Sequence, residues 1–239
     1  MRRFCLSVIT GLTVLALFYL PVPAQAFLKE IRFEINADYN IVSIEGVDEY
    51  LNDVNAFRTS EHYDKIDDIR GLSVGVRQTI YSKIGVMAEF GYLTGSTNQE
   101  EVTVWNKYGV ALGTVQEEFR FSTIHVSVGP SYRYEREAKA IQADIKSELH
   151  FMKFRHHTSE NKAANISGYD SDWNGMAFGL NGVVAAEWLP RSKVAVGGRV
   201  GYRVTESTDL TNDNNLIKTI IADLKGFYVS IYLAIMPWS

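Results

Sequence analysis

Cysteine is nearly absent from this chain of 239 residues. Its single cysteine, Cys5, belongs to the N-terminal segment, so residues 27–239 contain none. A disulfide framework, a zinc site with thiolate ligands and a thiol nucleophile are therefore excluded for residues 27–239. Cys5 precedes an apolar run and has no cleavage point of small residues before it, so it does not fit a lipidated cysteine.

Long apolar runs and clusters of basic residues are also missing beyond the N-terminal segment. No stretch of about 18 apolar residues follows residue 26, which excludes a helical membrane span there. The 24 Lys and Arg residues include Arg2 and Arg3, so residues 27–239 hold 22 bases against 28 acids, a net charge of −6. Nucleic acid is therefore not an expected partner.

The N-terminal segment has the layout of a signal peptide. Arg2 and Arg3 precede an apolar run from Leu6 to Leu20, and Pro23-Ala24-Gln25-Ala26 supplies an A-x-A cleavage site. We expect a cleaved signal peptide over residues 1–26 and a single exported domain over residues 27–239. Export without a helical anchor leaves the periplasm, the outer membrane or the medium as destinations.

Alternation of apolar and polar residues dominates the exported part. The stretch 71–92 alternates along two runs joined by Tyr81-Ser82-Lys83, which predicts a hairpin with a three-residue turn. Alternation predicts eight strands in all, near residues 30–41, 71–80, 84–92, 117–134, 140–155, 176–188, 194–204 and 227–235. In the fourth, the parity of the apolar residues flips upstream of Thr123, at Phe119 and Phe121, which predicts a β-bulge.

The connections alternate strictly between long and short. Short turns are expected at Tyr81–Lys83, Glu135–Lys139 and Leu189–Ser192, and long polar loops near 42–68, 96–116, 156–173 and 206–223. An up-and-down barrel with tight turns at one mouth produces this order. In the first long loop an i, i+3, i+4 pattern predicts a short amphipathic helix that covers part of its own loop: Val47, Tyr50, Leu51, Val54 and Phe57.

Alternation alone fits two kinds of barrel. In a soluble lipocalin-like carrier the polar side chains face the solvent outside, whereas in a membrane barrel the apolar side chains face outward to lipid. The polar parity mixes small residues with isolated charges, which suits a narrow lumen more than a solvated face. A Gly-x-Trp near the first strand and a helix after the last, both expected of a lipocalin, are missing from the sequence. We therefore expect the apolar parity to face lipid: Leu72, Val74, Val76, Val86, Phe90, Val126, Leu180, Val200, Val229, Ile231 and Leu233. Aromatic residues of that parity near strand ends predict interfacial girdles: Tyr39, Tyr92, Tyr132, Tyr134, Trp188 and Tyr202.

The glycine-rich alternating segments resemble a known family. Gly71–Val76, Phe90-Gly91-Tyr92, Val200-Gly201-Tyr202 and the final segment Gly226–Leu233 are similar to strands of the small eight-stranded outer-membrane barrels of the OmpX, OmpA-transmembrane-domain and opacity-protein kind. One departure is the end of the chain, where Ser239 takes the outward position usually held by an aromatic residue and Trp238 is one position off.

The resemblance implies an all-β, eight-stranded antiparallel up-and-down transmembrane barrel with short periplasmic turns and four long extracellular loops. It implies a monomer in the outer membrane of a Gram-negative-type bacterium, with a role in envelope integrity, surface interaction or adhesion. The implied partners are outer-membrane lipid or lipopolysaccharide, periplasmic chaperones and the barrel-assembly machinery. A conduit or carrier for small, including hydrophobic, molecules is the alternative.

With the apolar parity outward, the lumen receives ten charged residues: Arg32, Glu34, Asp38, Arg77, Glu89, Asp144, Lys146, Glu148, Arg199 and Arg203. Unpaired buried charges are costly, so these should interlock as ion pairs, with Arg77 and Glu89 as a direct cross-strand pair. A filled, rigid lumen is the structural expectation, and a narrow gated conduit is the functional alternative.

Catalytic and metal sites are weakly indicated. His125-x-Ser127, with Glu135 or Glu137, resembles the His-x-Ser pair of some outer-membrane lipid hydrolases, but His125 has the inward parity and no lipid substrate there. His62, His156 and His157 do not form a predictable metal site, and Asp209–Asn215 lacks the glycine of a calcium loop. We expect no enzyme, metal or cofactor.

Overall fold

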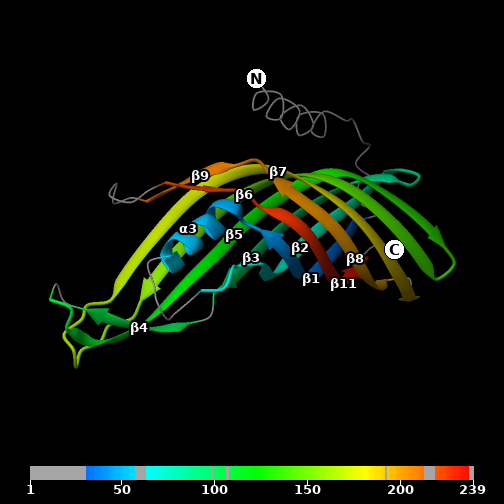
Figure 1. Cartoon of the computed structure of the whole chain (residues 1–239). Helices are drawn as coiled ribbons and strands as arrows, with labels where there is room; N and C mark the ends of the chain where they lie inside the picture. Colours follow the sequence, from blue (N-terminus) through cyan, green and yellow to red (C-terminus); the bar gives the residue numbers. More distant parts are fainter. Residues whose placement is uncertain are drawn as a thin grey trace, which may run out of the picture.

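The computed structural model describes residues 31–56, 63–97, 99–105, 108–191, 193–212 and 219–236. The expected signal peptide, Phe57, His62 and the terminal Trp238 and Ser239 lie outside these residues. The described part contains eleven strands and one helix, α3, and it forms an elongated barrel with an extension at one end (Figure 1).

Eight strands close into an antiparallel barrel, as the alternation predicts. They pair in chain order, and the circle closes because the first pairs with the last, as in Phe33 opposite Ile235. The barrel strands are β1 (Ile31–Ser43), β2 (Asp68–Tyr81), β3 (Ile84–Ser96), β5 (Ala111–Arg136), β6 (Lys139–Thr158), β7 (Tyr169–Arg191), β8 (Val194–Thr205) and β11 (Lys225–Ile235). Closure leaves the barrel no unpaired sheet edge along its circumference.

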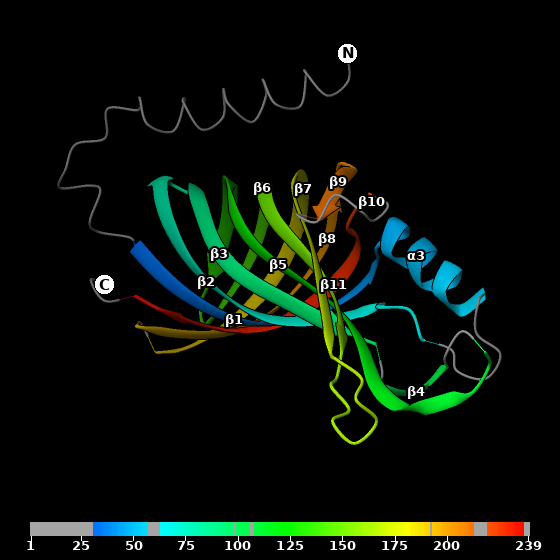
Figure 2. The ribbon, with the colours of Figure 1, turned by 90° about the vertical axis from the view of Figure 1, so that its left-hand side faces the viewer.

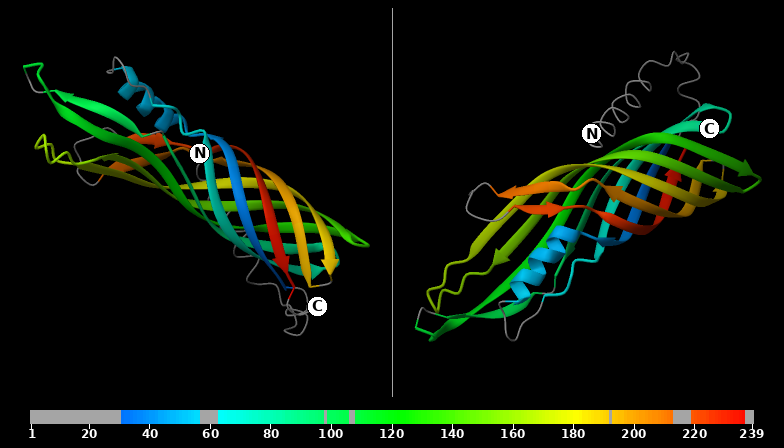
Figure 3. Two further views of the ribbon diagram at one scale, coloured as in Figure 1. Left: turned by 90° about the horizontal axis from the view of Figure 1, so that it is seen from below. Right: turned by 45° about the horizontal axis from the view of Figure 1, so that its top comes forward.

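The connections at one mouth are shorter than predicted. Strand β2 ends at Tyr81 and β3 begins at Ile84, so the turn contains two residues and not three. Ser82 takes the left-handed conformation with φ 50°, and Glu137 does the same in the turn between β5 and β6. The β1 start and the β11 end lie at this same mouth, opposite the end that carries α3 (Figure 3, left).

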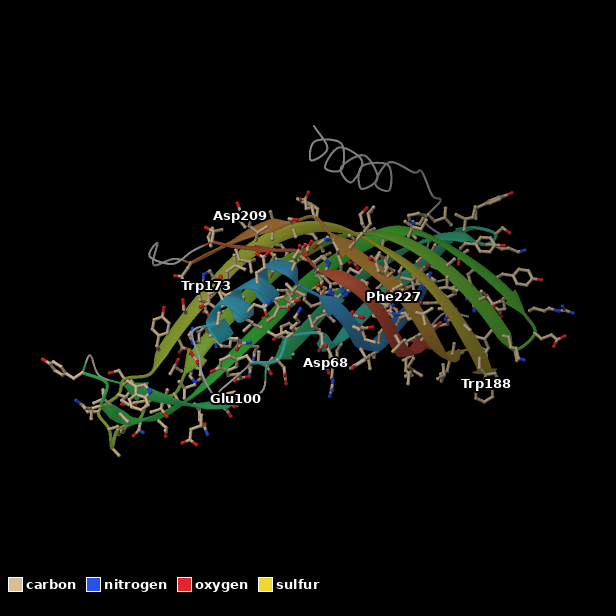
Figure 4. All side chains as sticks on the ribbon, viewed as in Figure 1. Asp68, Glu100, Trp173, Trp188, Asp209 and Phe227 are labelled. Carbon is tan, nitrogen blue, oxygen red and sulfur yellow. The ribbon has the colours of Figure 1, made fainter. Side chains whose placement is uncertain are left out.

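At the other mouth three strands continue far beyond the barrel. The long strands β5, β6 and β7 form a curved wall there, flanked by β4 (Glu100–Trp105) on one side and by β9 (Thr208–Asn212) and β10 (Ile220–Ala222) on the other (Figure 2). The expected loop 96–116 is therefore mostly strand, and the expected loop 156–173 shortens to residues 159–168 between β6 and β7. Trp173 and Trp188 mark the two ends of β7 (Figure 4).

The predicted helix exists as α3 (Glu45–Ala56), and Glu45 and Asp48 in its first turn suit the helix dipole. It packs against the inner face of the wall, which corrects the expectation that it only covers its own loop. Val47 and Leu51 are buried in one cluster with residues of the wall and of the neighbouring loops.

No bulge interrupts β5 near Thr123, contrary to the parity argument. The register with β6 is unbroken from Phe119 opposite His156 to Val126 opposite Leu149. Phe119, Phe121 and Thr123 are all buried and point the same way. The inward face itself changes from polar to apolar at this height, because beyond Thr123 it meets α3 and its surroundings instead of the charged lumen.

Candidate functional site

The lumen holds the ten predicted charged side chains, every one of which is less than 10% exposed. They lie on the parity opposite to the apolar residues, because successive side chains of a strand point to opposite faces. Arg77 is a clear example of their packing. Its Nε lies 2.9 Å from Glu34 Oε1, and its guanidinium nitrogens lie 2.6 and 3.0 Å from the two oxygens of Asp144. One cation therefore ties three strands together.

Glu89 is the centre of a second set. Its carboxylate accepts from Lys146 Nζ at 3.1 Å and from Arg199 Nη1 at 2.6 Å. Arg199 also reaches Asp38 Oδ1 at 3.1 Å, while Asp38 accepts from the Ser73 hydroxyl at 2.9 Å. The three ion pairs in this set cross the lumen between strands that are not neighbours, so they fill it and fix its shape.

Two more sets of ion pairs lie further along the barrel axis, one toward α3 and one toward the short turns. Both use residues that the sequence argument missed. Glu148 binds Arg203 Nε at 2.6 Å, Asn181 Nδ2 at 2.8 Å and His150 Nε2 at 3.0 Å. Near the short turns, Glu187 accepts from Arg32 at 2.7 Å and from both Arg133 and Tyr232. The signal was present in the sequence, since His150, Asn181, Glu187, Tyr228 and Tyr232 all have the inward parity.

Arg77 and Glu89 do not form the predicted cross-strand pair. Arg77 lies opposite Met87, and Glu89 lies opposite Gly75. A direct Arg77–Glu89 pair requires a hairpin register centred on residue 83, whereas the observed register is centred on residue 82. Because pairing across a hairpin shifts by two residues for each residue of turn displacement, the two side chains belong to different ion-pair sets.

Two tyrosines complete the filling of the lumen from β11, and glycines on β8 make room for them. A Cβ on Gly201 would lie 2.4 Å from the ring of Tyr228, and one on Gly197 would lie 2.5 Å from the ring of Tyr232. The guanidinium carbons of Arg203 and Arg199 also lie over the Tyr228 ring, 5.2 and 5.7 Å from its centroid, which are cation–π distances.

An apolar cap closes the other end of the lumen. Tyr50 of α3 packs its ring 5.7 Å from Phe154 and 5.6 Å from Trp173. Burial raises the pKa of Tyr50 to about 12, with the nearby charge of Glu117 acting in the same direction. The cap cluster consists of these rings together with Val47, Leu51, Tyr63, Ile66, Leu93, Phe119, Phe121, Met152, Leu210 and Ile220 among others.

A polar group locks the connection before β2 onto the wall above the cap. Tyr63 donates its hydroxyl hydrogen to Glu117, and His156 also hydrogen-bonds that carboxylate. The Tyr63 ring lies 4.8 Å from Phe119 and the His156 ring 4.4 Å from it. The cap is therefore held by apolar contacts on the side of the lumen and by the hydrogen-bonded carboxylate of Glu117 on the side away from it.

His125 and Ser127 lie inside the sealed lumen, 0% and 1% exposed. The His125 ring stacks on His150 with centroids 5.5 Å apart, and its Nε2 is 3.5 Å from Glu89. Glu135 is exposed at the short-turn mouth, bound to Arg133, and Glu137 lies in the turn. The four residues of the hypothetical hydrolase site are thus not assembled on a surface that lipid could reach.

The outer face of the barrel is apolar. Of the eleven side chains expected to face lipid, ten are at least 40% exposed and Val86 is half-buried. The six expected girdle aromatics are all exposed on the same face. Tyr39, Tyr92 and Tyr202 lie toward the cap, and Tyr132, Tyr134 and Trp188 lie toward the short turns.

Other kinds of site are not found in the described residues. No group of three or more His, Cys, Asp or Glu side chains there could hold a metal ion. Within the same residues, no helix has the length and apolar character needed to cross a membrane.

Comparison with known proteins finds similarity only to solved structures. No family model and no curated protein matches the sequence. The attachment invasion locus protein Ail of Yersinia pestis is similar with a TM-score of 0.37 at 13% identity, over 85% of this chain and 97% of that one. Neisserial surface protein A gives 0.43 at 10% identity, over 86% and 96%, and OprG of Pseudomonas aeruginosa gives 0.43 at 10%, over 88% and 97%. All three similarities are remote, so function has to be inferred from the geometry of this chain itself.

Proposed function

We propose that this chain is an outer-membrane barrel with a closed lumen, which anchors a structured extension outside the cell for surface interaction or envelope integrity. The observation that carries the proposal is the inverted polarity of the barrel. Ile231 is 72% exposed on its outside, whereas Lys146 is 0% exposed in its interior. Only a hydrocarbon surrounding makes such an outer face favourable, because about 25 cal/mol per Å² is lost when apolar surface faces water.

The closed circle of strands supports the same surroundings. Backbone groups without partners cost several kcal/mol in a lipid bilayer, and a barrel satisfies all of them between strands. The short turns are assigned to the periplasmic side, and α3, the wall and β4 to the outside of the cell. The filled lumen and the cap favour an anchoring role over a conduit, and no catalytic role is proposed for His125 and Ser127.

Cell fractionation tests this proposal directly. The full chain, expressed in a Gram-negative host, should be recovered in the outer-membrane fraction and should migrate differently on gels before and after heating. Protease added to whole cells should cleave within residues 42–68 or 97–110 and leave the barrel intact. Recovery in the soluble periplasmic fraction would overturn the assignment.

A further inference from the structure

An open cleft of about 520 Å³ lies on the outer wall of the barrel, toward the cap end. It is lined by Asp68 and Arg70 of β2, by Arg120 of β5, and by Tyr92, Thr94, Gly95 and Ser96 of β3. Asp68, labelled in Figure 4, marks its position on the ribbon. None of these residues takes part in the lumen network, so the cleft needs an explanation of its own.

The register of the strands explains the shape of the cleft. Strand β3 lies between β2 and β5, and its outward side chains become small and hydroxylated beyond Tyr92. Thr94 lies opposite Arg70 on one side, and Ser96 lies opposite Arg120 on the other. Two long guanidinium side chains therefore flank a floor of small hydroxyl-bearing residues.

The cleft begins where the apolar outer face ends. The last apolar row of the three strands is Leu72, Tyr92 and Ile124, which are paired across β2, β3 and β5. The next outward row is Arg70, Thr94 and Ser122. A lipid whose acyl chains lie along the apolar row thus brings its headgroup into the cleft.

The charge of the cleft suits an anion. Two arginines and one aspartate line it, a net charge of +1. Arg70 binds Asp68 at 3.1 Å and Arg120 binds Glu118 at 3.0 Å, and the arginine side chains are 75% and 54% exposed. Exposed pairs of this kind are weak, and each guanidinium has five N–H donors, so both arginines keep donors for a ligand. The guanidinium of Arg70 is also steadied over the Tyr39 ring, at 5.6 Å.

We propose that this cleft binds the phosphate group of a lipid headgroup in the leaflet that surrounds the cap end of the barrel, an inference that rests on the proposed membrane location. Arg70 and Arg120 donate paired hydrogen bonds to the phosphate oxygens from two sides, which is the geometry that guanidinium groups favour. The Thr94 and Ser96 side chains form the floor, and the acyl chains lie against Leu72, Tyr92 and Ile124.

Lipid binding to matched double variants tests the site. The full chain is folded in zwitterionic detergent and titrated with diphosphoryl lipid A, and bound lipid is counted by native mass spectrometry. R70Q/R120Q should weaken binding about tenfold or more, because charged hydrogen bonds are lost. K83Q/K139Q also removes two positive charges, from exposed positions at the short-turn mouth away from the cleft, and it should change binding by less than about threefold.

Two further arms identify the ligand. Lipid A without its phosphates should bind the unmodified chain as weakly as the phosphorylated lipid binds R70Q/R120Q. Inorganic phosphate at millimolar concentration should not displace the lipid, and efficient displacement would mean a free-anion site instead. Equal losses of lipid binding in the two double variants, or no loss in R70Q/R120Q, would overturn the assignment of the cleft as a lipid-phosphate site.

Folding and location are read separately from binding. Heat-modifiable migration of both variants shows that the barrel is intact, as expected for substitutions of exposed side chains. Cell fractionation tests the outer-membrane location. If the barrel is folded but binds no phosphorylated lipid, only the cleft assignment is contradicted. If the chain is recovered in the soluble fraction, the proposed function is contradicted.

Discussion

Arg77 shows how this barrel accommodates charge in a closed interior. Its guanidinium is buried on all sides, and the carboxylates of Glu34 and Asp144 take most of its donors. Across the lumen below the cap, the described ion pairs join six bases to six carboxylates: Arg32, Arg77, Arg133, Lys146, Arg199 and Arg203 to Glu34, Asp38, Glu89, Asp144, Glu148 and Glu187. Such a set is stable only while it stays complete, because removing one member leaves a buried charge uncompensated.

Replacing Arg77 by methionine should therefore destabilise the barrel by about 3–5 kcal/mol, since two buried carboxylates lose their cation. The triple variant Arg77→Met/Glu34→Gln/Asp144→Asn should recover a large part of that loss, because no isolated charge remains. Urea unfolding of the barrel in phospholipid vesicles measures both.

Arg155→Met serves as the control for Arg77→Met. Arg155 binds Asp172 at 2.8 Å and its side chain is 44% exposed. The hydrogen bond from Arg155 holds the pKa of Asp172 below its usual range. An exposed pair contributes about 0–1 kcal/mol, so this variant should unfold close to the unmodified chain. A triple variant no more stable than Arg77→Met would contradict the role given to the ion pairs.

At the scale of elements, the strands and α3 were predictable and the cap was not. Period-two alternation located all eight barrel strands, because each strand has an apolar outer face and a packed inner face. The same rule failed at Phe119 and Phe121, where the inward face becomes apolar without any change of parity. Alternation reports that two faces differ, and it cannot report what lies opposite each of them.

The sequence predicts which charged residues lie in the lumen, but it does not predict which of them pair with one another. Inward parity identifies Arg77 and Glu89 as lumen residues, yet their partners come from strands far away in the sequence, such as Asp144 for Arg77 and Arg199 for Glu89. Such cross-lumen contacts depend on strand tilt and stagger, which a single sequence does not fix. The cleft on β2, β3 and β5 was missed for the same reason, since it needs the register of three strands.

Alkaline titration of α3 tests the cap as an element. Burial raises the pKa of Tyr50 from 10.0 to about 12, so the folded cap favours the neutral hydroxyl. The resulting stabilisation is complete below pH 10 and is lost as the pH rises from about 10 to about 12. In a variant that keeps Trp173 as its only tryptophan, we expect its fluorescence to shift toward the red over this range, while the strand signal in circular dichroism persists.

The control for this titration is Tyr50→Phe in the same background. The ring contact with Trp173 at 5.6 Å can be kept by phenylalanine, but the ionisable hydroxyl is lost. The fluorescence shift should then be smaller or begin at higher pH. Superimposable titrations of the two proteins would show that Tyr50 does not control the cap.

At the scale of the whole molecule, two independent closures lie one above the other. The ion-paired lumen fills the barrel between the short turns and Thr123, and the apolar cap of α3 and the wall closes the mouth above it. The first is held by electrostatics in a buried setting and the second by apolar contact, so they should fail under different conditions. A passage for ions would require both to open.

The unmodified chain in planar bilayers should therefore show no stepwise conductance. Leu51→Asp places a charge in the apolar cap, where Leu51 is 1% exposed, and should loosen α3 so that protease cleaves the 42–68 connection faster. The Leu51→Asp variant should nevertheless show no stepwise conductance, because the ion-paired lumen below the cap remains closed. Asn52→Asp adds the same charge at an exposed position of α3 and should change neither property. Conductance steps in the unmodified chain would favour a conduit, and steps that appear only with Leu51→Asp would make the cap the sole barrier.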